Sequence, residues 1–143
     1  MIRSIQPSDA EALVEICRAA LGHEVSAAQL RRRIPALAED EAYFIAVFEG
    51  ENHRAIGFIQ AQRYRLLYGD DGWNIIALAV EPARQGRGVG RALLTALEEY
   101  ARDRGDAFVR LNSNVVRAGA HAFYARMGYA CDKTQKRFIK TLT

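Results

Sequence analysis

The segment RQGRGVGRALL (Arg84–Leu94) carries a glycine at every second position of its middle part, with arginines around them. It follows an apolar stretch and precedes a pattern typical of a helix. The first N–H groups of a helix have no partner within the helix, and the helix dipole adds partial positive charge there. Glycines would let an anion approach this backbone closely. The segment therefore predicts either an anion-binding turn or a tight turn with arginines nearby.

The spacing of the glycines argues against two common nucleotide sites. A dinucleotide fold requires G-x-G-x-x-G after its first strand and an acidic residue closing a later strand. The chain instead has G-x-G-x-G, more than halfway along its sequence. A P-loop requires Gly-Lys followed by Ser or Thr, whereas Gly90 is followed by Arg91 and Ala92. The glycines alone leave the nature of the anion open.

The elements around this turn mix strands and helices without repeats or linkers. SDAE (Ser8–Glu11) and SAAQ (Ser26–Gln29) are capping boxes that predict two helix starts. Pro35 is expected to kink or divide the second helix, and Gly105 to end a helix that starts at Gly88. Further strands are expected at Ile2–Ile5, on both sides of a turn at Gly50–His53, at Trp73–Val80, at Ala107–Leu111 and at Lys136–Leu142, with a last helix at Ala118–Met127.

The stretch Trp73–Val80 is apolar on both faces, because the residues at 75, 77 and 79 and those at 76, 78 and 80 are all apolar. A strand of this kind lies centrally in its sheet and is covered on both sides. The glycine turn therefore follows directly after a central strand.

The composition is that of an ordinary folded domain. Half of the 143 residues are hydrophobic, 26% are charged and the net charge is +3. Residues 1–143 are expected to form a single domain. Cys17 and Cys131 give no disulfide framework or metal-ligand spacing, so reduced thiols are expected. Without a membrane-length apolar run or a signal peptide, a soluble cytoplasmic protein is expected, with no membrane partner.

Two motifs carry a resemblance to a known family. QGRGVG (Gln85–Gly90) matches the Q/R-x-x-G-x-G/A pattern of the GNAT superfamily of acetyl-CoA-dependent N-acetyltransferases. AHAFYARMGY (Ala120–Tyr129) resembles the family's second segment, in which an F-Y pair on a helix precedes a glycine and an aromatic residue. The resemblance implies a mixed α/β fold with a mostly antiparallel central sheet of about six to seven strands, about four helices, and a splayed strand pair forming the coenzyme A cleft.

The resemblance implies acetyl-CoA as co-substrate, and no metal. The N–H groups from Arg87 to Ala92 would bind its pyrophosphate, and its pantetheine arm would lie along the end of the Ile76–Val80 stretch, as an extra strand would. A backbone N–H near Leu78 or Ala79 would meet the oxyanion. The residues expected to bind the cofactor are Leu78, Ala79, Val80, Gln85, Gly86, Arg87, Gly88, Val89, Gly90, Arg91, Ala92, Asn114 and Tyr124.

Tyr124 and Asn114 are the candidate catalytic residues that the resemblance implies. Tyr124 matches the tyrosine that protonates the departing thiolate, although its helical spacing with Ala120 and Met127 is also typical of a core residue. Asn114 matches an asparagine that holds the pantetheine arm or the reaction site, but it could equally be a turn former. His121 could be a surface histidine or, alternatively, a general base.

The general base stays unassigned, because Trp73–Val80 contains no acid where many relatives have a glutamate. Glu81 follows this stretch, and Asp70 and Asp71 precede it, where they could attract a cationic amine. Selection of the acceptor is expected from the loop Gln62–Gly72 and from the early helices. The side chains expected to contribute are Tyr64, Tyr68, His23 and Glu24.

The leading prediction is an N-acetyltransferase that moves an acetyl group from acetyl-CoA to a primary amine of a small molecule, by direct transfer in a ternary complex. The acceptor would be aminoglycoside-, polyamine- or amino-acid-like. A protein lysine or N-terminal acetyltransferase, and a non-catalytic acyl-CoA-binding regulatory module, are the alternatives. No nucleic-acid partner is expected, since the arginines at Arg84–Arg91 surround one turn. GNAT-like proteins are often dimers, so a homodimer is an open alternative.

Overall fold

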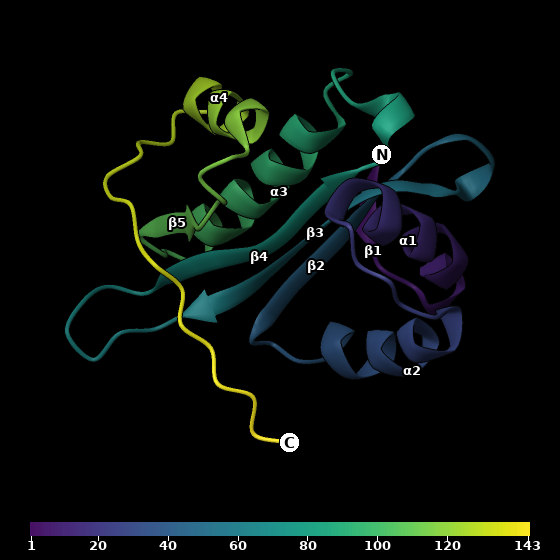
Figure 1. The fold of residues 1–143 in the computed structure, drawn as a ribbon, viewed down its shortest axis with the longest axis horizontal. Coiled ribbons are helices and arrows are strands. Elements are labelled where there is room, and N and C mark those ends of the chain that lie inside the picture. Colours follow the sequence, from purple (N-terminus) through teal and green to yellow (C-terminus); the bar gives the residue numbers. More distant parts are fainter. The chain divides into compact units, whose positions relative to one another are not determined.

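A five-stranded sheet organises the first part of the chain (Figure 1). The computed structural model describes residues 1–143, which divide into two units, Met1–Leu111 and Asn112–Thr143. The strands, all in the first unit, are β1 (Ile2–Ser4), β2 (Tyr43–Glu49), β3 (Ala55–Tyr64), β4 (Gly72–Val80) and β5 (Phe108–Leu111). They lie side by side in sequence order. Neighbours are antiparallel, except β4 and β5, which run parallel.

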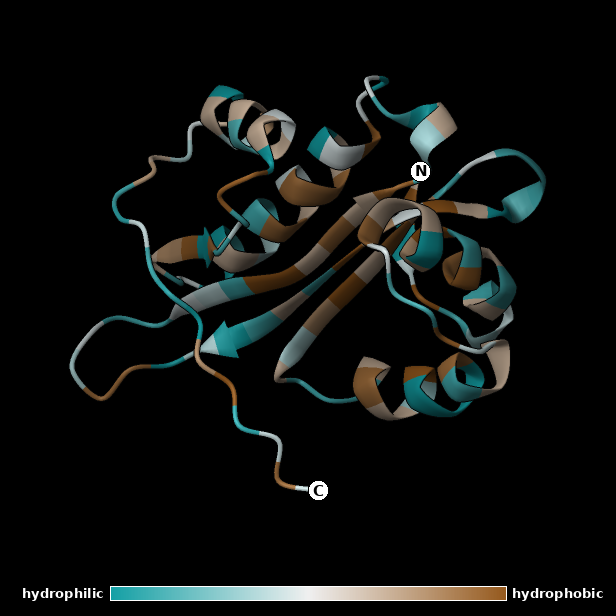
Figure 2. Cartoon of the chain, in the orientation of Figure 1, coloured by the Kyte–Doolittle hydropathy of each residue, from teal (hydrophilic) through white to brown (hydrophobic).

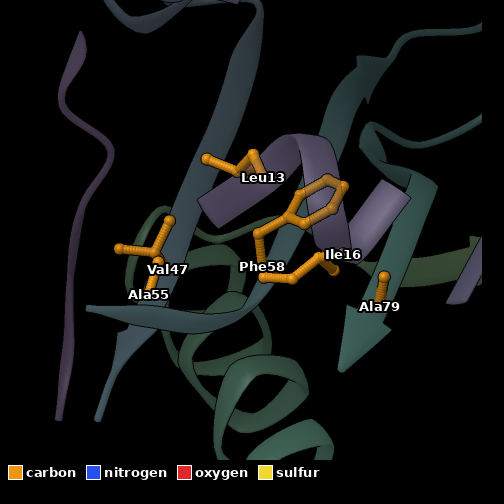
Figure 3. Packing of buried hydrophobic residues seen from close by; sticks show 6 residues of the cluster. All are labelled: Leu13, Ile16, Val47, Ala55, Phe58 and Ala79. Carbon is orange, nitrogen blue, oxygen red and sulfur yellow. The ribbon is translucent and has the colours of Figure 1, made fainter. Parts of the chain in front are cut away.

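Helices cover both faces of this sheet. They are α1 (Ala10–Ile16), α2 (Ala27–Ala38) and α3 (Val89–Asp103). Leu13 and Ile16 of α1 pack against Phe58 of β3 (Figure 3). Val89 and Leu93 of α3 lie against the backbone of Gly57 instead. Because neighbouring residues of a strand face opposite ways, α1 and α3 lie on opposite faces of the sheet.

The distribution of apolar residues agrees with this arrangement of the sheet and its helices. The inner parts of β2, β3 and β4 are hydrophobic in Figure 2, and the helices carry mixed surfaces. In α3 the buried residues recur at the three- and four-residue spacing of one helix face. These buried residues are Val89, Leu93, Leu94, Leu97 and Ala101. None of the helices combines the length and the apolar character that a membrane span requires.

Strand β4 is paired unequally with its two neighbours. It pairs with β3 along its whole length, but with β5 only over Gly72–Ile75. Ala61 pairs with Ile75 and Gln60 with Ala77, so Ile76 is an extra residue in β4, a β-bulge. Beyond Ile75 the edge of β4 that faces β5 therefore has no partner strand, as the splayed pair expected from the resemblance requires.

The carboxylate of Asp106 connects β3, β4 and β5 at the end of β4 that pairs with β5. It is 3% exposed and accepts hydrogen bonds from Trp73 Nε1 at 2.7 Å and from Arg63 Nη2 at 3.0 Å. Asp106 precedes β5, while Trp73 and Arg63 lie in β4 and β3. The N–H of Ala107 donates to the carbonyl of Asp71 at 2.9 Å. These contacts fix the start of β5 beside the start of β4.

The second unit holds one helix, α4 (Ala118–Arg126). It ends at a turn in which Gly128 has a φ of 91°. The N–H of Tyr129 returns to the carbonyl of Tyr124 at 2.9 Å. Residues 129–143 have no regular secondary structure.

The expectation of about six to seven strands is wrong, because the sheet has five. The strand expected at Lys136–Leu142 does not form. Its alternation puts lysine and apolar residues on one face and arginine and isoleucine on the other, so neither face suits a core. Its apolar side chains are accordingly 76 to 89% exposed. The mixed, mostly antiparallel sheet and the four helices are confirmed.

The helix boundaries differ from expectation at two places. The first helical segment is capped through Gln6 and Asp9, whose carboxylate accepts the N–H of Gln6 at 2.8 Å, and not through Ser8. Ser26 caps α2 as expected and accepts the N–H of Gln29 at 3.0 Å. Pro35 does not divide α2. The carbonyl of Arg31 that loses its helical partner lies on an exposed residue, where water can replace that bond.

We expect the variant Asp106→Ala to lower the free energy of unfolding by about 3 kcal/mol, because the guanidinium of Arg63 loses a buried partner. Urea denaturation followed by circular dichroism measures this change. Asp103→Ala removes an exposed carboxylate at the end of α3 and should change stability by less than about 0.5 kcal/mol. Equal effects of the two substitutions would show that Asp106 is no more important to the fold than a surface aspartate.

Candidate active site

The glycine loop, defined as Gln85–Ala92, connects the end of β4 to α3. Gly86 and Gly88 have positive φ values of 78° and 85°, a conformation that favours glycine. Gly88 is the N-cap of α3 and offers no side-chain cap. The first helical hydrogen bond runs from the N–H of Ala92 to the carbonyl of Gly88 at 3.0 Å. The N–H groups of residues 89–91 therefore have no carbonyl acceptor within the helix.

The space in front of the glycine loop is open. A Cβ added to Gly86 or to Gly88 would meet no atom within 4 Å. Arg87 and Arg91 are exposed, whereas the Nε of Arg84 lies 3.8 Å from the Glu81 carboxylate. Free helical N–H groups, the helix dipole and two exposed cations together form a site suited to an anion.

The end of β4 presents backbone groups beside this loop. The N–H of Glu81 donates to the carbonyl of Ile56 in β3 at 2.8 Å. Because backbone groups alternate sides along a strand, the N–H groups of Leu78 and Val80 point to the opposite, open edge, and that of Ala79 points to β3. The Val80 carbonyl on the open edge accepts the Gln85 Nε2 donor at 3.1 Å.

The Gln85 side chain thus makes a structural contact that the QGRGVG motif did not predict. Its side chain joins the last residue of β4 to the loop and so sets the position of the loop relative to the strand edge. The glycine loop and the edge residues Leu78 to Val80 are brought together within the first unit.

Tyr124 lies in the second unit, on α4. Its ring makes edge contacts with Phe123 and Tyr129, with centroid distances of 5.2 and 5.9 Å. Burial raises the pKa of the Tyr124 phenol above its ordinary value, and the positive charge of Arg117 opposes this shift. The phenol is consequently protonated at neutral pH, which a proton donor requires.

Asn114, also in the second unit, forms the turn before α4. Its side-chain oxygen accepts the N–H of Val116 at 3.1 Å, and its carbonyl accepts the N–H of Arg117 at 3.0 Å. His121 Nε2 lies 2.9 Å from the same carbonyl. The turn-forming role of Asn114 is therefore present, and its side-chain NH₂ group is the part that could contact a ligand. His121 helps to hold this turn.

The acids considered as general base have different surroundings. Asp71 accepts contacts from Arg63 at 3.3 Å and from Arg65 at 3.2 Å. Glu81 is bound by Arg54 at 3.0 Å. Asp70 is exposed. Cations already hold two of the three carboxylates, and the base stays unassigned. No group of three or more His, Cys, Asp or Glu side chains could hold a metal ion.

Sequence reasoning did not single out Asn74 and Arg110, which face each other across β4 and β5. Arg110 Nη1 donates to Asn74 Oδ1 at 2.5 Å, and its guanidinium lies 4.9 Å from the ring centroid of Tyr64. A polar Asn inside the apolar Trp73–Val80 stretch was the available signal. The arginine opposite to it could not be paired without the strand register.

Comparisons with known proteins agree with this geometry. Residues 10–129 match the Acetyltransferase (GNAT) family. The aminoalkylphosphonate N-acetyltransferase of Salmonella typhimurium is 34% identical over 101 residues, covering 70% of this chain and 62% of that protein. An uncharacterised N-acetyltransferase of Methanocaldococcus jannaschii is 38% identical over 61 residues, covering 43% of this chain and 27% of that protein. The chain thus spans less than two thirds of the length of either relative.

Solved structures share the fold at low sequence identity. A transcriptional regulator from Bacillus halodurans has a TM-score of 0.85 at 19% identity and covers 98% of this chain and 99% of its own. An aminoglycoside antibiotic 6'-N-acetyltransferase from Acinetobacter haemolyticus has a TM-score of 0.79 at 16% identity. The match covers 100% of this chain and 99% of that chain. The family match spans both the glycine loop and Tyr124. The chain therefore belongs to the GNAT family of acetyltransferases.

Proposed function

We propose that this protein transfers the acetyl group of acetyl-CoA to a primary amine of a small molecule, by direct transfer in a ternary complex. The observation that carries the proposal is the open glycine loop beside an unpaired strand edge. An elongated ligand with a pyrophosphate at one end and amide groups along its arm fits this combination. The aminoalkylphosphonate acetyltransferase relative is consistent with a small amine as acceptor.

The glycine loop would bind the pyrophosphate of the donor substrate. The free N–H groups of residues 89–91 and the dipole of α3 favour negative charge. The pantetheine amides would bond to Leu78 and Val80 along the open edge of β4, as a peptide does when it joins a sheet. We further propose that Asn114 binds the arm through its NH₂ group. Binding by backbone groups explains why no particular side chain is needed along the arm.

In the proposed reaction the amine nitrogen forms a bond to the thioester carbon and the carbon–sulfur bond breaks. The carbonyl oxygen gains negative charge, which the N–H of Leu78 would stabilise, since this N–H points to the open edge while that of Ala79 points to β3. The Tyr124 phenol would give its proton to the departing thiolate. The proton of the amine would pass to water, because no acid within β4 can take it.

Thiol release from acetyl-CoA tests the proposal directly. The purified protein is mixed with acetyl-CoA and with amines of several classes: polyamines, aminoglycosides, amino acids and lysine peptides. Amine-dependent release with small molecules supports the proposal. Release with peptides alone would favour protein acetylation, and binding of acetyl-CoA without release would favour a non-catalytic module.

Replacing Gly88 by Ala should weaken coenzyme A binding by about ten-fold or more, which corresponds to the loss of one charge-assisted hydrogen bond. A side chain there would occupy the space in front of the free N–H groups. Calorimetric titration with coenzyme A measures the affinity.

Gly105→Ala is the matched control for this change. Gly105 lies beyond the other end of α3, with a φ of 79° and no atom within 4 Å of an added Cβ. Both variants therefore carry similar backbone strain of about 1–2 kcal/mol. An equal affinity for coenzyme A in the two variants would argue against phosphate binding at the glycine loop.

Tyr124→Phe should reduce kcat by about a hundred-fold or more, because general acid catalysis is lost, while the affinity for coenzyme A stays nearly constant. The raised pKa predicts that ionisation of Tyr124 does not limit activity until the pH exceeds the ordinary tyrosine value of about 10. Steady-state kinetics as a function of pH test both statements. Tyr129→Phe removes the same oxygen from the neighbouring ring and should retain most activity. Full activity of Tyr124→Phe would show that Tyr124 is not the proton donor and has only a packing role.

A further inference from the structure

Three amide side chains form a row on one face of the sheet: Gln60 and Gln62 of β3 and Asn74 of β4. Phe58, which packs against α1, shares its face of β3 with Gln60 and Gln62, because side chains alternate along a strand. Asn74 pairs with Gln62, so its side chain lies on the same face. Figure 2 shows the end of β3 as hydrophilic. This amide row therefore lies beyond the apolar part of the face that α1 packs against.

The contacts of the amide row fix the orientation of two of its amides. Arg110 Nη1 donates to Asn74 Oδ1 at 2.5 Å. A guanidinium can only donate, so the oxygen of Asn74 faces Arg110 and its Nδ2 lies on the other side of the amide. Asn74 Nδ2 lies 3.5 Å from Gln62 Oε1. The oxygen of Gln62 thus faces Asn74, and its Nε2 is left as a donor.

Two groups of the amide row have unused hydrogen-bonding capacity. Neither the Nε2 of Gln62 nor the amide of Gln60 makes a hydrogen bond within the chain. Both residues are half-buried. Buried side-chain polar atoms without a partner occur only at Arg63 and Ser113. The two glutamine amides therefore border space that water or a ligand can reach, where such a partner would complete their hydrogen bonds.

The amide row lies close to the proposed reaction site. Gln60 pairs with Ala77, and the next residue of β4 is Leu78, whose N–H points to the open edge. Paired residues of antiparallel strands lie about 5 Å apart, and Gln62 is about 7 Å from Gln60 along β3. The side chain of Ala77 is a single methyl group, which leaves room between Gln60 and the open edge. A short amine that reacts at Leu78 would therefore extend over Ala77 toward the amide row.

The segment that follows α1 gives this face an apolar side. Residues Cys17–Leu21 lie beside β4. Cys17 and Leu21 pack against the same apolar cluster as Ala77. The face thus changes from apolar near α1 to polar at the amide row. A polar group of the acceptor is matched only at the amide row.

The unused groups of the two glutamines match a hydroxyl group. The Nε2 of Gln62 donates, whereas the amide of Gln60 has no partner that fixes it and can turn its oxygen to accept. A hydroxyl group both donates and accepts, so it can bond to both glutamines at once. A methyl group in the same place would exclude water and leave both amides without a partner.

We propose that Gln60 and Gln62 bind a hydroxyl group of the acceptor, so that the preferred substrates are small amino alcohols. The inference rests on the proposed acetyltransferase function and adds the class of acceptor. Gln60 and Gln62 contact the substrate, and Asn74 is a positioning residue that orients Gln62.

Two amines of equal size, 3-aminopropan-1-ol and butylamine, test the hydroxyl group, because they differ only in an OH or a CH₃ group at the end of the chain. For the unmodified protein we expect kcat/KM to be about ten-fold higher for the amino alcohol. In Gln62→Met the amino alcohol should lose about three- to ten-fold, mainly through KM, while butylamine changes by less than about two-fold.

Gln135→Met is the matched control, since it removes an exposed glutamine amide from the segment without regular secondary structure. It should leave both amines nearly unchanged. Asn74→Ala should raise KM for the amino alcohol and not for butylamine, which a purely structural role would not do. Equal acetylation of the two amines by the unmodified protein, or an equal loss for both in Gln62→Met, would overturn the inference while leaving the acetyltransferase function intact.

A binding measurement decides the role of the amide row if no amine is acetylated and the proposed function fails. Two-dimensional ¹H–¹⁵N NMR spectra also contain the side-chain NH₂ signals of glutamine, and the signals of Gln60 and Gln62 are those that disappear in the corresponding methionine variants. With excess coenzyme A present, 3-aminopropan-1-ol should shift these signals clearly more than butylamine at the same concentration. Equal shifts with both amines, or none with the amino alcohol, would overturn the inference.

Gln60→Met carries the same test if Gln62→Met does not fold. The amide of Gln60 makes no hydrogen bond within the chain, so its replacement removes no internal contact of that kind. The ratio of kcat/KM for the amino alcohol to that for butylamine should fall about three- to ten-fold in this variant. An unchanged ratio would overturn the inference.

Discussion

The unequal pairing of β4 is the constraint on which the rest of the structure depends. β4 is hydrogen-bonded to β3 along its whole length, but β5 ends opposite Ile75. The bulge at Ile76 marks the point where the two parallel strands part. Asp106 keeps the other end closed through Trp73 and Arg63. The result is one strand whose first half is internal to the sheet and whose second half offers backbone donors and acceptors on one edge.

This division gives the two ends of β4 different chemistry. At its end, Val80 is joined to the glycine loop by Gln85, which holds the strand edge beside the helix N-terminus, where the proposed donor substrate would contact both. The groups available there are almost entirely backbone N–H and carbonyl groups. At its start, the contacts between Arg110, Asn74 and Tyr64 are made by side chains. The proposed donor site thus depends on backbone groups at one end of β4, whereas side chains connect the strands at its other end.

Much of the fold, including the glycine turn at the start of α3, could be predicted from the sequence. The capping box at Ser26, the stop at Gly105 and the doubly apolar Trp73–Val80 stretch are local signals, and local structure followed them. The strand expected at Lys136–Leu142 does not form, because its alternation leaves charged residues on both faces and a strand needs a partner and a face to bury. The contact between Arg110 and Asn74 was missed for a related reason: it depends on a strand register between residues 36 positions apart in sequence.

The backbone amides themselves provide the most direct test of the central claim, that coenzyme A is bound by the open edge of β4 and the start of α3. Two-dimensional ¹H–¹⁵N NMR spectra recorded during a titration with coenzyme A follow each N–H separately. The largest shifts are expected for Leu78, Val80 and residues 89–91, with little change at Gly105. Shifts confined to other parts of the chain, with these amides unchanged at saturation, would contradict the account.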